Sequence, residues 1–582
     1  MLIIWIGGGG ALAELCTSMR ATVYRLSSRR TNRAQDAISR FRPRPRSVRD
    51  GVTASLRCNA MALDSTPSVA MATAIAGLFF CLQLYTAILF MRRAKASRKP
   101  PSAKGWVPIL GHALKYKRDP AAFITEQCRR VGPCFTIDLA GKRMVIVGSS
   151  RVAVKQVASA PESVLSARQA VLDIGFAYTL GELNVTVGTD LHKRIVKQAY
   201  GDARKLADEI PQLYAAIGRG LEASGAEASD ATSGANVGDL FELVRFTMLR
   251  VSLERMCGNS VLEHAGETFL RSYMRFQDRV EDATAKAAVL PRCLALPLVL
   301  WPTQRRRAAI SESLASAIAA AVRAPTSITA SRDATADDDG IGPWVRALVL
   351  EDGRSAADAA ELICGLLFAA HKNPAIGAAQ ALLFALTEAE PKALAAARAD
   401  AAALHASPSA ETLARCEGLR AICFETLRVC AHTIGAVRTV VHPDGFDLTV
   451  GACGASDSGG SEGGVSYHLP AGTTVALAHI PTHRNTDVWG ASSEAFDPSR
   501  AEWAAGAPRP DDYTFTTFSQ GLHRCPGERL AHPMMQCALA QLLSGGFETT
   551  LVPGKSVPPV DFERATLAQR AAPVALNVHR RA

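Results

Sequence analysis

The residues with the clearest chemical potential lie near the C-terminus, in the stretch FSQGLHRCPG at 518–527. Cys525 comes directly before a run that predicts a helix, because Pro526 suits a first helical turn and Glu528 suits its positive end. A cysteine at a helix N-terminus has a lowered pKa, so it can exist as a thiolate and bind a metal. This stretch alone leaves four interpretations open: a buried core residue, a zinc ligand, a nucleophile, or a thiolate that holds a larger group.

Glycines and cationic side chains surround the cysteine in a way that suits a flat, negatively charged partner. Gly521 and Gly527 allow the backbone to come close to such a partner and to turn N–H groups toward the sulfur. His523 and Arg524 can donate hydrogen bonds to carboxylates. A haem has both properties, and a thiolate axial ligand pushes electron density onto its iron and favours O–O cleavage.

The spacing Phe-x-x-Gly-x-x-x-Cys-x-Gly, present as Phe518, Gly521, Cys525 and Gly527, resembles the signature of the cytochrome P-450 superfamily. The resemblance implies that haem b is the cofactor and that Cys525 is its axial iron ligand. It also implies that Phe518 and Gly521 shape the ligand loop, and that the two residues before the cysteine are candidates for contacts with the haem propionates.

A second family motif lies upstream, at Glu425 and Arg428. Their spacing places two opposite charges on one helix face, where they can pair. In the family this E-x-x-R pair belongs to an internal ion network with a downstream partner. The segment FDPSR at 496–500 resembles the family's F-x-P-x-R, which makes Arg500 the expected partner.

Three more residues are candidate propionate contacts by the same resemblance. Arg438, in GAVRTV, lies where relatives contact a propionate. The family's usual W-x-x-x-R contact is absent, and His192 and Lys193 in TDLHKRIVKQAY are its candidate substitutes.

The chain departs from the family pattern on the helix that crosses the other face of the haem. Members that activate oxygen carry A-G-x-[DE]-T there, and the matching stretch is LLFAAHKNPA at 366–375. In this alignment Lys372 replaces the acid and Asn373 replaces the threonine, with His371 just before them. We treat these three residues as the catalytic candidates, because Asn373 can still hydrogen-bond a water or a peroxide.

Three functions remain open from the sequence. Similarity to the branch of sterol demethylases and of bile-acid and oxysterol hydroxylases implies a monooxygenase that inserts one oxygen atom from O2 into a sterol or other lipophilic substrate, with electrons from NADPH through a reductase. The same branch contains prostacyclin-synthase-like isomerases and dehydratases, which rearrange a lipid peroxide without a reductant. The altered distal stretch also allows a non-catalytic haem- or lipid-binding protein.

The pattern of the chain predicts a mainly α fold with a minor β component. The resemblance covers about residues 99 to 579 and implies the cytochrome P-450 fold for a haem-thiolate catalytic domain at 113–582. Amphipathic helical runs occur at 206–223, 307–323, 357–389 and 410–430. Short β-like pieces occur at 134–139, 144–148 and 473–478. Loops are expected at 325–343 and 451–464.

A single-pass membrane anchor is predicted at 68–91, where the 23 residues at 69–91 carry no charge. A basic, proline-rich hinge follows at 92–112, and this positive flank predicts a cytosolic catalytic domain on the endoplasmic reticulum membrane. Residues 1–60 are rich in Arg and poor in acid, so they are either a targeting segment or a misassigned leader. A targeting segment would favour an organelle membrane, and the redox partner would then be a ferredoxin in place of NADPH cytochrome P-450 reductase.

Charge and cysteine usage exclude two other classes of protein. The net charge of +11 comes from residues 1–100, which hold sixteen Lys and Arg against four Asp and Glu, so the rest of the chain carries a net −1. A nucleic-acid-binding function therefore loses its main support. The fourteen cysteines form no CxxC pair, which argues against a disulfide scaffold and the common zinc modules.

Overall fold

The computed structural model describes residues 99–226, 235–290, 292–323, 340–451, 464–504, 512–543, 545–562 and 567–580. The leader expected at 1–60 and the anchor expected at 68–91 lie outside the described residues, as do most of the two expected loops. Residues 99–112, in the expected hinge, contain no helix, and the first described helix begins at Ala113.

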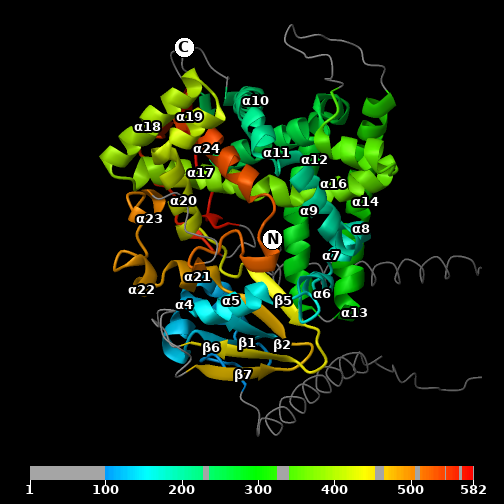
Figure 1. Ribbon diagram of the computed structural model, residues 1–582, viewed down its shortest axis with the longest axis vertical. Coiled ribbons are helices and arrows are strands. Elements are labelled where there is room, and N and C mark those ends of the chain that lie inside the picture. Colours follow the sequence, from blue (N-terminus) through cyan, green and yellow to red (C-terminus); the bar gives the residue numbers. More distant parts are fainter. Residues whose placement is uncertain are drawn as a thin grey trace, which may run out of the picture. The chain divides into compact units, whose positions relative to one another are not determined.

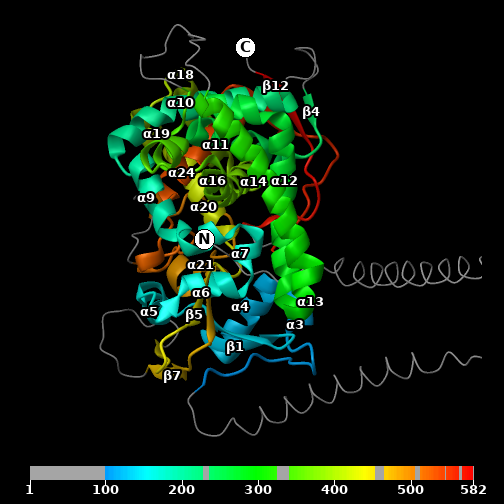
Figure 2. The same cartoon turned by 90° about the vertical axis from the view of Figure 1, so that its right-hand side faces the viewer.

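Helices dominate the described chain, and the larger ones gather at the end of the catalytic body opposite the main sheet (Figures 1 and 2). This confirms the predicted mainly α fold with a minor β component. The longer helices are α4 (Pro120–Val131), α5 (Arg151–Ser159), α9 (Gly188–Tyr200), α10 (Ala203–Leu221), α11 (Leu240–Cys257), α12 (Asn259–Val289), α14 (Trp301–Arg323), α16 (Ala356–Ala370), α17 (Lys372–Thr387), α18 (Pro391–Ala406), α20 (Glu417–Val429) and α24 (Glu528–Leu543). The shorter ones are α3 (Ala113–Arg118), α6 (Ala167–Asp173), α7 (Phe176–Thr179), α8 (Glu182–Thr186), α13 (Arg292–Ala295), α15 (Pro343–Val345), α19 (Ala410–Arg415), α21 (His479–His483), α22 (Thr486–Trp489) and α23 (Ala501–Ala504).

The main sheet has five strands in the order β1-β2-β8-β5-β3. Strands β1 (Cys134–Leu139) and β2 (Lys142–Val147) form a hairpin whose two turn residues, Ala140 and Gly141, have φ of 54° and 92°. Such a turn matches the twist of the paired strands. Strand β8 (Thr474–Leu477) runs parallel to β2, and the three predicted β pieces fall on β1, β2 and β8. The other strands are β3 (Leu165–Ser166), β4 (Ala235–Val237), β5 (Ala436–Val440), β6 (Phe446–Val450), β7 (Val465–Leu469), β9 (Phe547–Leu551), β10 (Val560–Asp561), β11 (Gln569–Arg570) and β12 (Leu576–Arg580).

The core is built around the helical run expected at 357–389, which is divided in two. Helix α16 ends at Ala370 and α17 begins at Lys372, with His371 between them. The combined stretch Ala356–Thr387 is long and apolar enough to span a membrane by composition, but 72% of its most apolar window is buried inside the body. Its apolar character is therefore explained by packing against neighbouring helices, including α11, α20 and α24.

A fully buried carboxylate joins α20 to the segment that leads toward the cysteine loop. Arg428 donates to both oxygens of Glu425, each at 2.7 Å, and Arg500 Nε donates to Glu425 Oε1 at 3.1 Å. Trp503 Nε1 donates to Glu425 Oε2 at 3.1 Å. The remaining N–H groups of Arg428 donate to backbone carbonyls, including that of His483 at 2.7 Å. The expected ion network of Glu425, Arg428 and Arg500 therefore forms in the structure.

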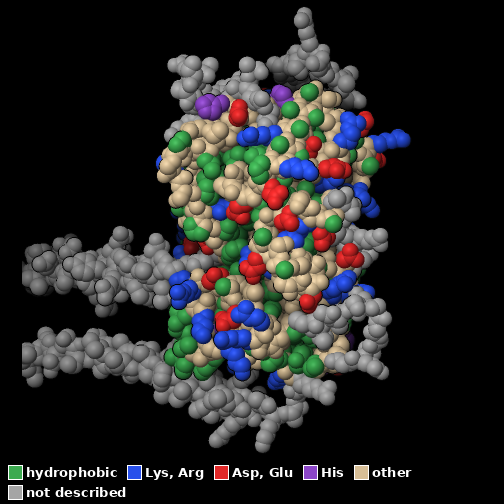
Figure 3. Space-filling view, turned by 90° about the vertical axis from the view of Figure 1, so that its left-hand side faces the viewer, with side chains coloured by type: hydrophobic (Ala, Val, Ile, Leu, Met, Phe, Trp, Pro, Cys, Tyr) green, Lys and Arg blue, Asp and Glu red, His purple; other side chains and the backbone are tan. Residues whose placement is uncertain are grey.

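The face drawn in Figure 3 carries both basic and acidic side chains over the described residues, and several basic side chains gather near its lower end. Acidic side chains lie among them, so this face has a mixed charge.

Removing the Glu425 carboxylate should be severely destabilising. Glu425→Ala leaves two buried guanidinium groups without their counter-charge, which costs about 3–5 kcal/mol in buried ion pairs. We expect a lower denaturation midpoint of the full-length protein and less folded material. Glu411→Ala is the matched control, because Glu411 pairs with Arg415 on an exposed helix face. Equal midpoints for the two variants would contradict a structural role for Glu425.

Candidate functional site

Cys525 lies in the loop before α24, and two left-handed residues fix the path of that loop. Gly521 has φ of 62°, and a Cβ at this position would lie 2.5 Å from the carbonyl oxygen of Ala158, so a larger residue does not fit. Ser519 has φ of 59°, a conformation that costs a non-glycine residue about 1–3 kcal/mol. The Cys525 N–H donates to the Phe518 carbonyl at 2.8 Å, which closes the loop.

The environment of the Cys525 sulfur differs from the sequence expectation. Burial raises the pKa of the Cys525 thiol, whereas the helix N-terminus was expected to lower it. The backbone N–H groups of Gly527 and Glu528 donate to the sulfur and lower the pKa, but by less than burial raises it. Because metal coordination deprotonates a thiol outright, the same two N–H groups suit a metal-bound thiolate.

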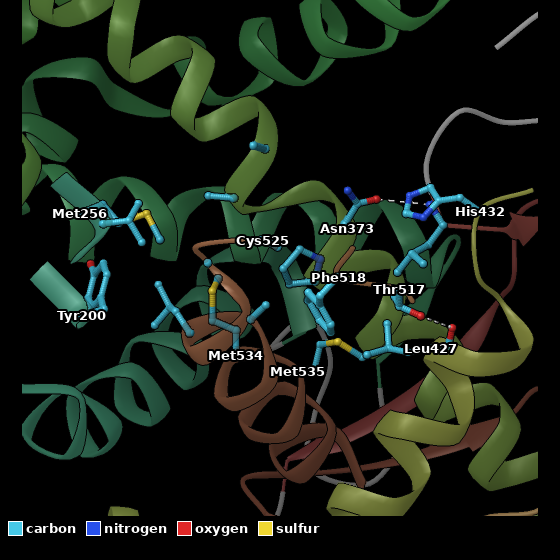
Figure 4. A pocket seen from close by; sticks show the side chains of 18 of the residues that line it. Tyr200, Met256, Asn373, Leu427, His432, Thr517, Phe518, Cys525, Met534 and Met535 are labelled. Carbon is cyan, nitrogen blue, oxygen red and sulfur yellow. Dashed lines mark hydrogen bonds between the residues drawn. The ribbon is translucent and has the colours of Figure 1, made fainter. Parts of the chain in front are cut away.

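A cavity of about 760 Å³, measured with its opening, lies against Cys525 (Figure 4). Most of its lining is apolar, and it comes from elements far apart in the sequence: α9, α11, α15, the α16–α17 junction, the end of α20, the cysteine loop and α24. Ala369 and Ala370 line it from α16, and their small side chains leave space beside that helix.

Of the three catalytic candidates, Asn373 lines the cavity. Its Oδ1 accepts a hydrogen bond from the Leu567 N–H at 3.2 Å, so its amide NH2 group is left for another partner (Figure 4).

The structure does not bring Lys372 and His371 to the cavity. Lys372 is 1% exposed, and its Nζ donates to Asp278 at 2.9 Å and to Glu281 at 2.6 Å on α12. His371 bonds to the Leu367 carbonyl at 2.7 Å. Successive helical residues point in different directions, and here only the third of the three faces the cavity.

Three of the predicted propionate contacts lie in one region. Arg438 on β5 is 6% exposed, and its Nε has no hydrogen-bond partner among the described residues. Burial lowers the pKa of Arg438 to about 10. Burial and the nearby Arg438 charge lower the pKa of His523 to about 4, and Lys193 also contributes. Glu162 is the acidic neighbour, with its Oε2 3.7 Å from His523 Nε2. A buried guanidinium with an unpaired donor suits an anionic ligand.

The other two predicted contacts lie elsewhere. Arg524 donates twice to Glu528, at 2.6 and 3.1 Å, on the surface of the protein. Burial lowers the pKa of His192 to about 4, and its Nε2 has no hydrogen-bond partner among the described residues.

Sequence reasoning missed several cavity residues, most clearly His432 and Thr517. Both lie beside motifs that were identified, His432 seven residues after Glu425 and Thr517 just before Phe518. Residues between two site motifs must pass near the site, and this is the signal that could have found them. Tyr200 and Trp344 carry no comparable signal, because only the tertiary fold brings α9 and α15 to the cavity.

These residues fit a haem held through a thiolate. Cys525 would bind the iron, and Arg438, His523 and Lys193 would bind the propionates. The unpaired Arg438 Nε and His523 Nε2 are the donors that such carboxylates would satisfy. The fold and the site therefore define the class of helical haem-thiolate proteins.

Comparison with known proteins agrees with this class. The family model "Cytochrome P450" matches residues 100–578, so the chain belongs to the cytochrome P450 family. The family implies a haem-thiolate cofactor.

Individual relatives are similar over shorter stretches. Cytochrome P450 7B1 of Mus musculus is 42% identical over 76 residues, which is 13% of this chain and 15% of that protein. The mitochondrial 25-hydroxyvitamin D-1 alpha hydroxylase of Homo sapiens is 32% identical over 149 residues, 26% of this chain and 25% of that protein. Cytochrome P450 714C3 of Oryza sativa subsp. japonica is 25% identical over 228 residues, 36% of this chain and 41% of that protein. The chain thus spans less than half the length of each of these relatives.

Replacing the proposed iron ligand should abolish the haem-thiolate spectrum. In the reduced protein with carbon monoxide, the wild type should give the Soret band of a haem-thiolate complex, and Cys525→Ala should lose it because no thiolate remains. Cys293→Ala is the control, since Cys293 is exposed and is not one of the cavity residues. An unchanged band in Cys525→Ala would remove Cys525 as the ligand.

The rate at which the protein loses haem should show which of Arg438 and Arg524 contacts a propionate. Arg438→Met removes a buried donor, so haem transfer to an acceptor protein should become about tenfold faster, the effect of losing about 1.5 kcal/mol from a charged hydrogen bond. Arg524→Met removes a surface pair with Glu528 and should change the transfer rate little. A larger effect from Arg524→Met would reverse this assignment.

Proposed function

We propose that the protein is a monooxygenase that inserts one oxygen atom from O2 into a lipophilic substrate. The observation that carries the proposal is that Asn373 and Cys525, from different elements, line one largely apolar cavity. NADPH would supply two electrons, the second oxygen atom would leave as water, and the substrate C–H bond would become C–OH. When bound, the haem supplies the iron at which this oxygen chemistry takes place.

The protein side chains would bind and orient the reactants. The apolar lining favours a lipophilic molecule and excludes bulk water. The Asn373 amide would hold a water molecule in the cavity by its free N–H groups. A carboxamide does not titrate near neutral pH, so a proton would reach the reacting oxygen through that water and not from the side chain itself.

The substrate class and the redox partner are part of the proposal. The name of the human relative describes a hydroxylase of a vitamin D compound, which supports a sterol-like or other lipophilic substrate. That name also places the relative in mitochondria, so electron delivery by a ferredoxin needs testing beside NADPH cytochrome P-450 reductase.

We also propose that the protein binds a membrane. The described part of the hinge and α3 present several large apolar side chains to solvent, among them Trp106, Ile109 and Leu114. Lys115, Lys117 and Arg118 follow within α3. Exposed tryptophan with neighbouring cations suits the boundary between lipid and water. The endoplasmic reticulum is the favoured membrane, with the catalytic domain in the cytosol, and an organelle membrane is the alternative.

One observation favours a second function, a lipid peroxide isomerase or dehydratase. The described residues of α16 and α17 that line the cavity are Ala369, Ala370, Asn373 and Pro374, so this wall presents neither a carboxylate nor a hydroxyl group. A reaction that rearranges a peroxide needs no protons from solvent and no reductant, and it would tolerate this lining.

The two functions predict opposite requirements. For the monooxygenase, purified haem-loaded protein with NADPH and a redox partner should consume O2 and form a hydroxylated lipid. Asn373→Leu should form that product about tenfold more slowly, since it loses about one strong hydrogen bond to water, and Asn373→Thr should recover much of the rate because it restores a polar group. Product analysis and O2 uptake measure both effects.

The isomerase predicts that the protein turns over a lipid hydroperoxide without NADPH or a redox partner and shows no NADPH-dependent O2 uptake. That result would contradict the monooxygenase proposal and support the isomerase. Equal product rates in wild type and Asn373→Leu would remove Asn373 from the proposed proton path.

A further inference from the structure

The cavity contains one buried imidazole that the proposed oxygen chemistry does not use. His432 lies between the end of α20 and the start of β5, is 2% exposed, and lines the cavity together with Asn373 and Leu567. Neither of its ring nitrogens has a hydrogen-bond partner among the described residues. In the close view it enters from one end of the cavity, with Tyr200 and Met256 at the other end (Figure 4).

The side chains around His432 do not satisfy it. Thr517 donates its hydroxyl to the Leu427 carbonyl at 3.2 Å, and His479, whose ring centroid is 6.3 Å away, bonds through Nδ1 to Thr516 at 2.6 Å. A buried polar group without a partner is unfavourable, and this ring carries two. Such a cost is expected where a ligand completes the hydrogen bonding.

The protonation state of His432 limits the chemistry of that ligand. Burial, assisted by the nearby His479, lowers the pKa of His432 well below its usual range, so the ring is neutral. A neutral imidazole has one donor and one acceptor. A hydroxyl group can accept a hydrogen bond from the ring N–H or donate one to the unprotonated nitrogen, so it can pair with either tautomer. A carbonyl uses only the donor, and a carboxylate favours a cationic ring.

We propose that His432 binds a hydroxyl group of the substrate, so that the preferred substrate is a lipophilic alcohol and not a hydrocarbon or a fatty-acid anion. This inference rests on the proposed monooxygenase function and adds the polar group by which the site selects its substrate. The remaining cavity lining is mostly apolar. A hydrogen bond at His432 would therefore also orient the substrate, with its hydroxyl end at His432 and its apolar end in the rest of the cavity.

Discrimination between an alcohol and its deoxy analogue tests the proposal directly. The full-length, haem-loaded protein is titrated with three pairs: cholesterol and cholest-5-ene, 1-hexadecanol and hexadecane, and farnesol and its deoxy hydrocarbon. Shifts of the Soret band report binding. At least one alcohol should bind wild type about tenfold or more tightly than its partner, the effect of about 1.4 kcal/mol from the hydrogen bonds to the ring.

Variants of His432 and its neighbour assign the effect to the imidazole. His432→Leu should bind both members of the preferred pair equally, and His432→Gln, which keeps a donor and an acceptor, should recover part of the preference. Thr433→Val is the matched control, because Thr433 is buried next in the chain and is not a cavity residue; it should keep the wild-type preference. Ligand-free His432→Leu should be at least as resistant to thermal unfolding as wild type, since it removes an unsatisfied buried ring.

Several results would overturn the inference. Equal binding of alcohol and deoxy partner by wild type, or a preference retained in His432→Leu, would remove the hydroxyl contact while leaving the monooxygenase proposal intact. A nitrogen-ligand spectrum of ligand-free wild type that is lost in His432→Leu would make the ring an iron ligand instead. Binding of neither member of any pair would overturn the inference and the lipophilic-substrate proposal together, and NADPH-dependent O2 uptake would then show whether oxygen chemistry survives.

Discussion

The arrangement of the site depends on one buried carboxylate, Glu425. Its two oxygens accept from the guanidinium groups of Arg428 and Arg500, from the indole of Trp503 and from a backbone N–H. This set of bonds fixes α20 against the segment at 489–503, which continues into the cysteine loop. The chain leaving α20 then passes the cavity and enters β5. The chain therefore leads from this buried network to the proposed propionate contact on β5 in one direction and to the proposed iron ligand in the other.

The local features of this protein could be predicted from its sequence, whereas the direction of individual side chains could not. Strands β1, β2 and β8 follow from short β-branched and aromatic runs, and the cysteine loop follows in part from Gly521, whose left-handed backbone the structure uses. Lys372 shows the limit. The break between α16 and α17 changes which residues face the cavity, and the partners of Lys372 on α12 are about ninety residues away in the sequence. The sulfur of Cys525 shows another limit, because a helix N-terminus is visible in the sequence and the surroundings that raise the pKa of the thiol are not.

The cavity combines a small number of polar groups with a large apolar surface. Asn373 has one side of its amide held by the backbone of Leu567, Thr517 is bonded to the backbone of α20, and His432 is left unpaired. This distribution separates two tasks in one site. A fixed amide on the α17 wall suits the reacting oxygen, and an unpaired ring at the end of the cavity suits recognition of the molecule that reacts. Substrate choice and oxygen chemistry can then change independently, because they depend on different side chains.

The ion cluster of Lys372 limits which substitutions this chain tolerates. Asp278 and Glu281 on α12 both accept from the lysine, and Arg245 on α11 also pairs with Asp278. Replacing Lys372 by an acid would place a third carboxylate beside the half-exposed Asp278 and the largely buried Glu281, and their repulsion would weaken the link between α12 and α17. The lysine and its two acidic partners therefore tolerate a change of charge only if they change together.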